Sequence, residues 1–182
     1  DRERANFQNA VEAAKKILGI QIVVLQLPIG EESDFKGVVD LVSRKAYLTG
    51  SDGKTGVGDI PPEMSDEIEA ARMSLVESIA ETDDVLVEKY LEGETISDEQ
   101  LLAALRKGVA SGAVIPALCG SGMTGAGASV FVDAAEQYFP SPLERAPYLC
   151  KDANGESREV APDPNAPFLG ILFKTFADPF TG

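Results

Sequence analysis

Val114-Ile115-Pro116-Ala117-Leu118-Cys119-Gly120-Ser121 is the stretch that decides the fold. A run apolar at almost every position is typical of a strand buried on both faces of a parallel sheet. In such sheets ligands bind at the carboxyl ends of the strands, where small residues let a ligand approach the backbone. The run therefore predicts an α/β fold with a binding loop at Gly120 and Ser121. A buried strand can also end in Gly-Ser simply to turn.

Composition excludes several classes of protein. The chain has 182 residues, 44% of them hydrophobic, and a net charge of −14 from 16 basic and 30 acidic residues. That length allows one core, or one core with an insertion. The acidic balance argues against direct nucleic-acid binding. No apolar run reaches the roughly 18 residues that a membrane-spanning helix needs.

The inventory of reactive side chains is short. The chain has no histidine, which excludes His-based triads and His metal ligands. No group with diagnostic spacing predicts a metal site or a catalytic residue. We interpret Cys119 and Cys150 as reduced thiols of a cytoplasmic protein. Asp1 is not an initiator Met and the chain stops after a strand-like run, so both ends look cut from a longer polypeptide.

Hydrophobic periodicity predicts alternating helices and strands. Pro61-Pro62 is expected to open a helix, and Ser97 with Gln100 forms a capping-box pattern. The predicted elements, in order, are a helix over 7–18 stopped by Gly19, a strand over 22–27, a small antiparallel sheet over 38–48, helices over 64–79, 85–91 and 101–109, the buried strand over 113–119, a helix over 130–138, a linker, and a last strand over 168–176.

This order suggests an insertion. A parallel crossover needs only a dozen or so residues, far fewer than lie between Gly19 and the strand at 113. We therefore expect residues 20–112 to be an inserted α+β subdomain within an α/β domain formed by 1–19 and 113–140. A linker over 141–167 would follow.

The expected insertion is strongly acidic. Residues 59–99 hold fourteen acidic and two basic residues, a net charge of −12. One interpretation is a set of solvated helix faces. The other is a docking surface for a basic partner, attracted over a long range. The residues proposed for that surface are Glu69, Glu77, Glu81, Asp84 and Glu88.

Three other motifs are ambiguous. Residues 50–55, Gly-Ser-Asp-Gly-Lys-Thr, look like a phosphate-binding loop, but position 48 is Leu where that motif needs Gly, which favours a surface turn. Asp83-Asp84 and Glu31-Glu32 lack companion ligands, which favours exposed charge. The glycine-rich residues 120–127 could form a phosphate cradle or a base-binding loop.

Several segments, taken together and in order, resemble translation elongation factor G. The segments that carry this resemblance are Leu25-Gln26-Leu27-Pro28-Ile29-Gly30, Phe35-Lys36-Gly37-Val38-Val39-Asp40-Leu41, Glu88-Lys89-Tyr90-Leu91-Glu92-Gly93, Pro116-Ala117-Leu118-Cys119-Gly120-Ser121 and Tyr138-Phe139-Pro140-Ser141-Pro142.

The resemblance implies a fold. It is the C-terminal part of a P-loop GTPase domain, three-layered with a mainly parallel sheet, carrying the inserted subdomain. Residues 168–182 would start a β-barrel domain, and an apolar strand cut from its barrel could pair with another chain.

The resemblance also implies a guanine site. Asp1 falls on the last residue of the Asn-Lys-x-Asp motif, whose carboxylate accepts hydrogen bonds from guanine N1–H and the exocyclic amine. Ser121 matches the serine of the second guanine loop, where the next backbone N–H contacts the guanine carbonyl. Gly122 stands where that loop usually has Ala, and still supplies the N–H.

The implied activity is GTP hydrolysis coupled to translocation on the ribosome, with GTP or GDP and Mg²⁺ bound in the intact protein. The segment itself is expected to lack catalysis and to bind no cofactor tightly, because phosphate-binding and switch elements would precede Asp1. The insertion would contact the ribosomal stalk protein. The alternatives are an acidic protein-interaction module that docks on a ribosomal stalk protein or another basic partner, and a non-translational α/β enzyme domain.

Overall fold

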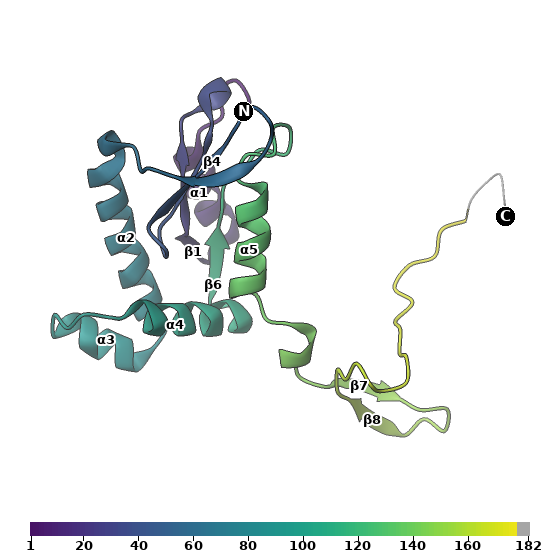
Figure 1. Ribbon diagram of the computed structural model, residues 1–182. Helices are drawn as coiled ribbons and strands as arrows, with labels where there is room; N and C mark the ends of the chain where they lie inside the picture. Colours follow the sequence, from purple (N-terminus) through teal and green to yellow (C-terminus); the bar gives the residue numbers. More distant parts are fainter. Residues whose placement is uncertain (178–182) are drawn as a thin grey trace. The chain divides into compact units, whose positions relative to one another are not determined.

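The structure, a computed structural model, describes residues 1–177. The chain consists of two compact units, with the boundary between them after Pro140. The first unit begins with helix α1 (Phe7–Leu18), which Asn6 caps by accepting a hydrogen bond from the Asn9 N–H. Gly19 ends the helix in the left-handed conformation, with φ of 64°, as the sequence predicts. Figure 1 shows the order of the elements.

Two strands far apart in sequence form a parallel pair. Strand β1 (Gln21–Val24) pairs with β6 (Val114–Ala117), with Val24 opposite Ala117. Among residues 1–177, parallel pairing is limited to these two strands. The three-layer, mainly parallel layout thus stays a prediction. Strand β1 lies within the range predicted as the insertion, yet its parallel partner lies outside that range.

The other sheet of this unit is antiparallel, as expected. It contains β2 (Gln26–Ile29), β3 (Gly37–Asp40), β4 (Lys45–Thr49) and β5 (Thr55–Gly58), in that spatial order. The chain changes partner at Leu25. The Leu25 N–H donates to the Ala117 carbonyl at 3.0 Å, and the Leu25 carbonyl accepts from the Leu41 N–H at 2.9 Å. One extended segment therefore belongs to both sheets.

Three helices follow the antiparallel sheet, as predicted. They are α2 (Ser65–Ala80), α3 (Asp84–Leu91) and α4 (Asp98–Ser111). The capping box of Ser97 and Gln100 forms at the start of α4. Helix α4 contacts both α2 and β6 (Figure 1). The helices bury apolar residues in the core of the unit, among them Ile68, Leu75, Ile79, Leu101 and Leu105.

The prediction that the strand at 113–119 is buried on both faces is wrong. Val114 is 2% exposed, but Ile115, which points to the opposite face, is 37% exposed. Val114 packs so closely on α4 that a Cβ added to Gly108 would lie 2.9 Å from its Cγ2. Helix α4 packs on the face of β6 that carries Val114, while the face that carries Ile115 is only partly covered within the described residues.

Helix α5 (Ala128–Tyr138) completes the first unit and lies beside β6 (Figure 1).

The second unit includes a hairpin of β7 (Tyr148–Lys151) and β8 (Ser157–Val160). The range predicted as a linker, 141–167, therefore contains regular secondary structure. The Asp152 carboxylate accepts from the Asn154 and Glu156 N–H groups, and Gly155 has φ of 82°. These are hairpin-turn features.

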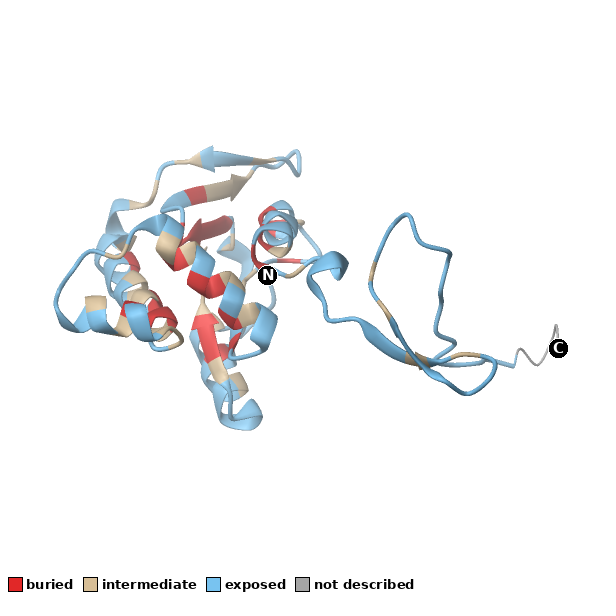
Figure 2. Ribbon diagram, turned by 90° about the horizontal axis from the view of Figure 1, so that it is seen from below, coloured by how far each residue is buried: buried red, intermediate tan, exposed pale blue. Residues whose placement is uncertain are grey.

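The predicted strand over 168–176 is also absent, since residues 161–177 form no regular secondary structure. No residue from 141 to 177 is buried (Figure 2). Phe168 is 97% exposed and Phe173 is 92% exposed. A strand needs a pairing partner, and this stretch has none within the described residues. The assignment of 168–182 to a β-barrel stays a prediction, and residues 178–182 lie outside the described residues.

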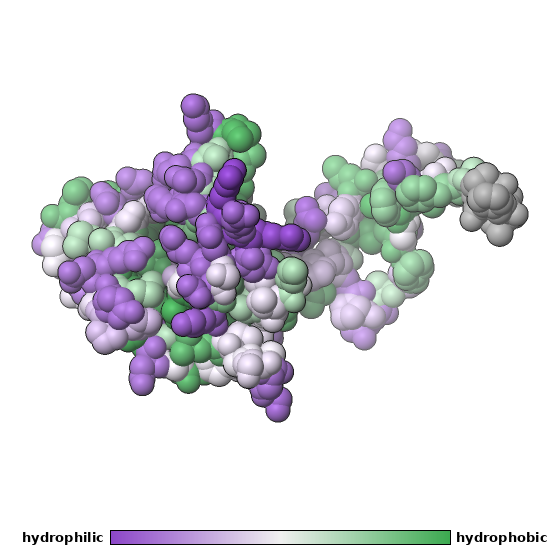
Figure 3. All heavy atoms as spheres, turned by 90° about the horizontal axis from the view of Figure 1, so that it is seen from above, coloured by the Kyte–Doolittle hydropathy of each residue, from purple (hydrophilic) through white to green (hydrophobic). Residues whose placement is uncertain are grey.

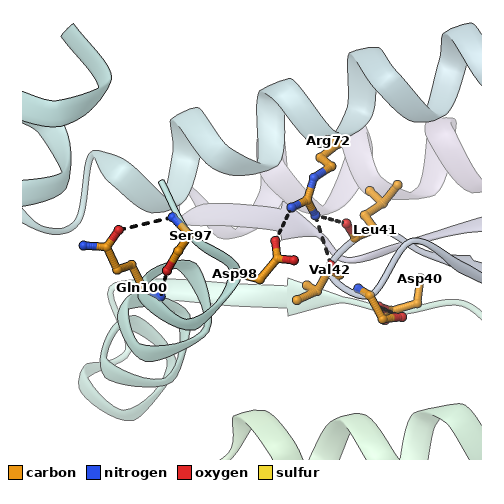
Figure 4. A network of polar contacts seen from close by, with 8 residues as sticks. Asp40, Leu41, Val42, Arg72, Ser97, Asp98 and Gln100 are labelled. Carbon is orange, nitrogen blue, oxygen red and sulfur yellow. Dashed lines mark hydrogen bonds and ion pairs between the residues drawn. The ribbon is translucent and has the colours of Figure 1, made fainter. Parts of the chain in front are cut away.

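Arg72 joins three elements of the first unit. Its guanidinium donates to the Leu41 carbonyl, to the Val42 carbonyl at 3.1 Å, and to the Asp98 carboxylate at 2.5 Å (Figure 4). The Arg72 side chain is 13% exposed. It therefore fixes α2 against the turn after β3 and against the first residue of α4.

We predict that Arg72→Met lowers the free energy of unfolding by about 2–4 kcal/mol, because two carbonyls lose a charged donor. Urea unfolding followed by circular dichroism measures the loss. Lys54→Met is the control, since Lys54 is 86% exposed and its ion pair spans 3.9 Å. It should change stability by less than about 0.5 kcal/mol. Equal losses in the two variants would contradict the bridging role.

Candidate functional site

The structure brings together two of the residues proposed for guanine binding. The Ser121 hydroxyl donates to the Asp1 carboxylate at 2.6 Å, across 120 positions of sequence. Ser121 is 4% exposed, whereas Asp1 is exposed. The contact lies at the short end of the range for hydrogen bonds between two oxygens. One carboxylate oxygen is thereby fixed while the side chain stays open to a ligand.

The loop after β6 is closed by its own hydrogen bonds. The Ser121 hydroxyl oxygen accepts from the Thr124 N–H at 3.0 Å and from the Met123 N–H at 3.3 Å. The Ser121 N–H donates to the Ala126 carbonyl at 2.8 Å. Ser121 thus supports both the loop and Asp1.

The third proposed residue, Gly122, lies exposed at the loop surface. A Cβ added there would meet no heavy atom within 4 Å. The loop therefore has room for the alanine that the resemblance leads one to expect. Gly127 is different, because its φ is 78° and an added Cβ would lie 2.8 Å from the Cys119 carbonyl oxygen. Glycine is needed at 127 and not at 122.

Two hollows flank this loop. Asp1 and Cys119 help to line one of about 290 Å³, together with Phe7, Pro28 and Phe35. The other, of about 390 Å³, is lined by Ser121, Gly122, Phe131 and Val132 among others. Both hollows combine apolar side chains with loop backbone.

Sequence comparison gives this geometry its context. The chain is 40% identical over 185 residues to elongation factor G of Neorickettsia sennetsu (strain ATCC VR-367 / Miyayama), an alignment covering 100% of this chain and 27% of that protein. It is 37% identical over 186 residues to elongation factor G of Ureaplasma parvum serovar 3 (strain ATCC 27815 / 27 / NCTC 11736), with the same coverage. No protein-family model matches the chain.

The whole chain is related in sequence to elongation factor G. The resemblance stated from the motifs is thereby confirmed, and the chain spans about a quarter of the length of these relatives, 27% in each case. A crystal structure of a Thermus thermophilus protein matches with a TM-score of 0.69 and 31% identity, over 78% of this chain and 21% of that one.

The five acidic residues proposed for partner binding are all exposed. In this elongation factor G-related chain, Glu69 and Glu77 lie two turns apart on α2, with Met73, 62% exposed, one turn from each. Glu81 follows α2 and accepts from the Gln21 amide at 3.2 Å. Asp84 and Glu88 lie on α3, which contacts α2.

The surface of the larger unit is mixed in character. Hydrophilic side chains cover much of the visible face of the larger unit in Figure 3, with hydrophobic side chains between them. An open depression on α2, lined by Glu69, Met73 and Glu77 among others, combines both kinds of residue.

The other acidic pairs have local roles. Asp83 caps α3 by accepting from the Val85 N–H, and its ion pair with Lys107 spans 3.0 Å. The hydrogen bond from Lys107 is the main cause that lowers the pKa of Asp83. Glu32 accepts from the Arg4 N–H at 2.8 Å. Within residues 1–177 no group of three or more His, Cys, Asp or Glu residues could hold a metal ion.

No helix in the described part of the chain is long and apolar enough to cross a membrane.

Sequence reasoning overlooked one residue at the site, Gln26. The Cys119 N–H, two positions before Ser121, donates to the side-chain oxygen of Gln26 at 3.3 Å. A buried glutamine within an apolar strand was the available signal.

Burial raises the pKa of the Cys119 thiol to about 12. At pH 8 the reactive thiolate would then be roughly one part in ten thousand, against roughly a quarter in an unfolded chain. We predict that Cys119, studied in a Cys150→Ser background, reacts with iodoacetamide on the order of a thousand times more slowly in native buffer than in urea. Mass spectrometry of timed samples measures both rates. Similar rates would show that the loop leaves Cys119 accessible.

Proposed function

We propose that this chain is a segment of a GTP-binding translation elongation factor and that it supplies part of the guanine pocket. Two observations support the proposal. The chain is related along its full length to elongation factor G. The Ser121 hydroxyl donates to the Asp1 carboxylate at 2.6 Å, which brings together two of the residues that the resemblance assigns to guanine binding.

The proposed chemistry is base selection. Ser121 orients the Asp1 carboxylate, which keeps lone pairs for the N1–H and exocyclic amine of guanine. The Gly122 N–H lies at the loop surface, where it can donate to the guanine carbonyl. Adenine offers a ring acceptor in place of N1–H, which would leave the carboxylate unpaired and disfavour ATP.

The remaining chemistry belongs to the intact protein. We propose that it binds GTP or GDP with Mg²⁺, couples GTP hydrolysis to translocation on the ribosome, and acts in the cytoplasm. The segment contributes base recognition, and hydrolysis depends on elements elsewhere.

We predict that Asp1→Asn in the intact protein weakens GTP binding about 10- to 100-fold and favours xanthosine triphosphate. The reason is that the amide replaces one carboxylate acceptor with a donor, which suits the extra oxygen of xanthine. Competition against a fluorescent guanine nucleotide measures both affinities. Asp133→Asn, on the exposed surface of α5, is the control. Unchanged GTP affinity in Asp1→Asn would remove Asp1 from the pocket.

A second proposed role is docking of a basic partner on α2 and α3. The resemblance to elongation factor G implies that this partner is the ribosomal stalk protein. The observation that favours docking is the exposure of all five proposed acidic residues. It is strengthened by Arg72, whose charge is directed to internal carbonyls and Asp98 and so does little to neutralise this surface.

We predict that the combined variant Glu69→Gln/Glu77→Gln weakens stalk-protein binding about three- to tenfold at low salt, with a smaller effect at high salt. Titration calorimetry of the 182-residue chain at both salt concentrations gives the comparison. Asp133→Asn/Glu136→Gln on α5 removes the same charge from another exposed surface and should have little effect. Absence of wild-type binding at either salt would refute the docking role.

A further inference from the structure

Gln26 is a buried polar residue in an apolar strand. It is 0% exposed and lies on β2 directly after Leu25, where the chain changes partner. Its side-chain oxygen accepts from the Cys119 N–H, across 93 positions of sequence. Its side-chain nitrogen is the one buried side-chain polar atom without a hydrogen-bond partner in the described part of the chain. Only the oxygen of its carboxamide therefore has a hydrogen-bond partner, and that partner lies in the segment after β6.

The strand register explains why Cys119 needs this acceptor. In a parallel ladder with Val24 opposite Ala117, the Leu25 N–H donates to the Ala117 carbonyl, and the Cys119 N–H should donate to the Leu25 carbonyl. The first bond is present at 3.0 Å. The Leu25 carbonyl, however, accepts from the Leu41 N–H of the antiparallel sheet at 2.9 Å. The Cys119 N–H would otherwise lack its strand partner.

The Gln26 side chain replaces that missing main-chain acceptor. Its oxygen continues the hydrogen bonding of β6 past Ala117, where regular pairing ends. Two residues later Ser121 begins its contacts with Ala126, Thr124 and Asp1. The start of the loop is thus held from the strand side by Gln26, and the rest is held by Ser121.

We propose that Gln26 is a positioning residue for the guanine loop, a role that rests on the proposed function of Ser121 and Gly122. An apolar side chain of similar length would remove the unpaired buried nitrogen and its desolvation cost. It would also leave the Cys119 N–H unpaired and free the loop at its first residue. Glutamine at this position thus fixes the loop but leaves one buried donor unsatisfied.

The direct test is amide hydrogen exchange by NMR on the 182-residue chain. In Gln26→Met the Cys119 amide should exchange about tenfold faster, as expected for loss of one hydrogen bond. Ser121 should follow in the same direction, while the Leu25 amide keeps its wild-type rate. Gln26→Glu retains an acceptor oxygen, so Cys119 protection should persist even if overall stability falls.

The matched control is Gln21→Met, which removes a carboxamide from the start of the same extended segment. Gln21 donates to the Ser78 carbonyl and to Glu81, away from the loop. The Gln21→Met variant should leave the exchange rate of the Cys119 amide unchanged. Unaltered Cys119 exchange in Gln26→Met, or equal acceleration in Gln21→Met, would overturn the proposal. If Gln26→Met does not fold, loss of Cys119 protection in a folded Gln26→Glu would overturn it equally.

Nucleotide binding by the intact protein separates this inference from the proposed function. Gln26→Met should weaken GDP binding about three- to tenfold, mainly through faster dissociation. If Gln26→Met alters Cys119 exchange but neither Gln26→Met nor Asp1→Asn changes the affinity for GDP, the guanine site is refuted. The contact between Gln26 and the loop is then still supported. If Asp1→Asn changes the preference from guanine to xanthine nucleotides but Gln26→Met leaves Cys119 exchange unaltered, only the role of Gln26 is refuted.

Discussion

The structure of the first unit depends on the two main-chain hydrogen bonds of Leu25. The N–H of this residue belongs to the parallel pair and its carbonyl to the antiparallel sheet. Leu25 is itself 0% exposed. A shift of register by one residue would turn every side chain of this segment to the opposite face and break both sheets together. The position of β6 relative to the antiparallel sheet is therefore fixed at a single residue.

This arrangement also explains how Asp1 reaches Ser121. Helix α1 precedes β1 and contacts it, and the chain reverses at Gly19, so α1 starts near the edge where β1 ends. Strand β6 runs parallel to β1 and ends at the same edge. The residues before α1 and those after β6 consequently meet at the carboxyl ends of the strands. The hydroxyl of Ser121 then orients a carboxylate that is already close, which lowers the cost of ordering it when a ligand binds.

Sequence reasoning succeeded where a local signal carries the structure. Gly19 and the Ser97–Gln100 pair end and start their helices as predicted, because caps act within one turn. The strand predicted over 168–176 failed because apolar residues alone do not make a strand without a partner. The β7–β8 hairpin was overlooked although Asp152 to Gly155 carries a turn signal. The sequence shows Gln26 only as a polar residue in an apolar run, and its hydrogen bond with the Cys119 N–H could not have been predicted because it depends on how the two sheets meet at Leu25.

The two proposed roles of the chain differ in the range over which their forces act. The acidic residues of α2 and α3 are exposed, so their attraction for a basic partner falls off over a Debye length, about 8 Å at physiological salt. The contact of Ser121 with Asp1 acts at 2.6 Å, and Ser121 is buried. Ions screen such a contact far less. Arg72 does little to neutralise the acidic surface, because its guanidinium donates to carbonyls inside the unit. The proposed docking on the acidic helices should therefore depend on the salt concentration, while the contact of Ser121 with Asp1 should keep its geometry.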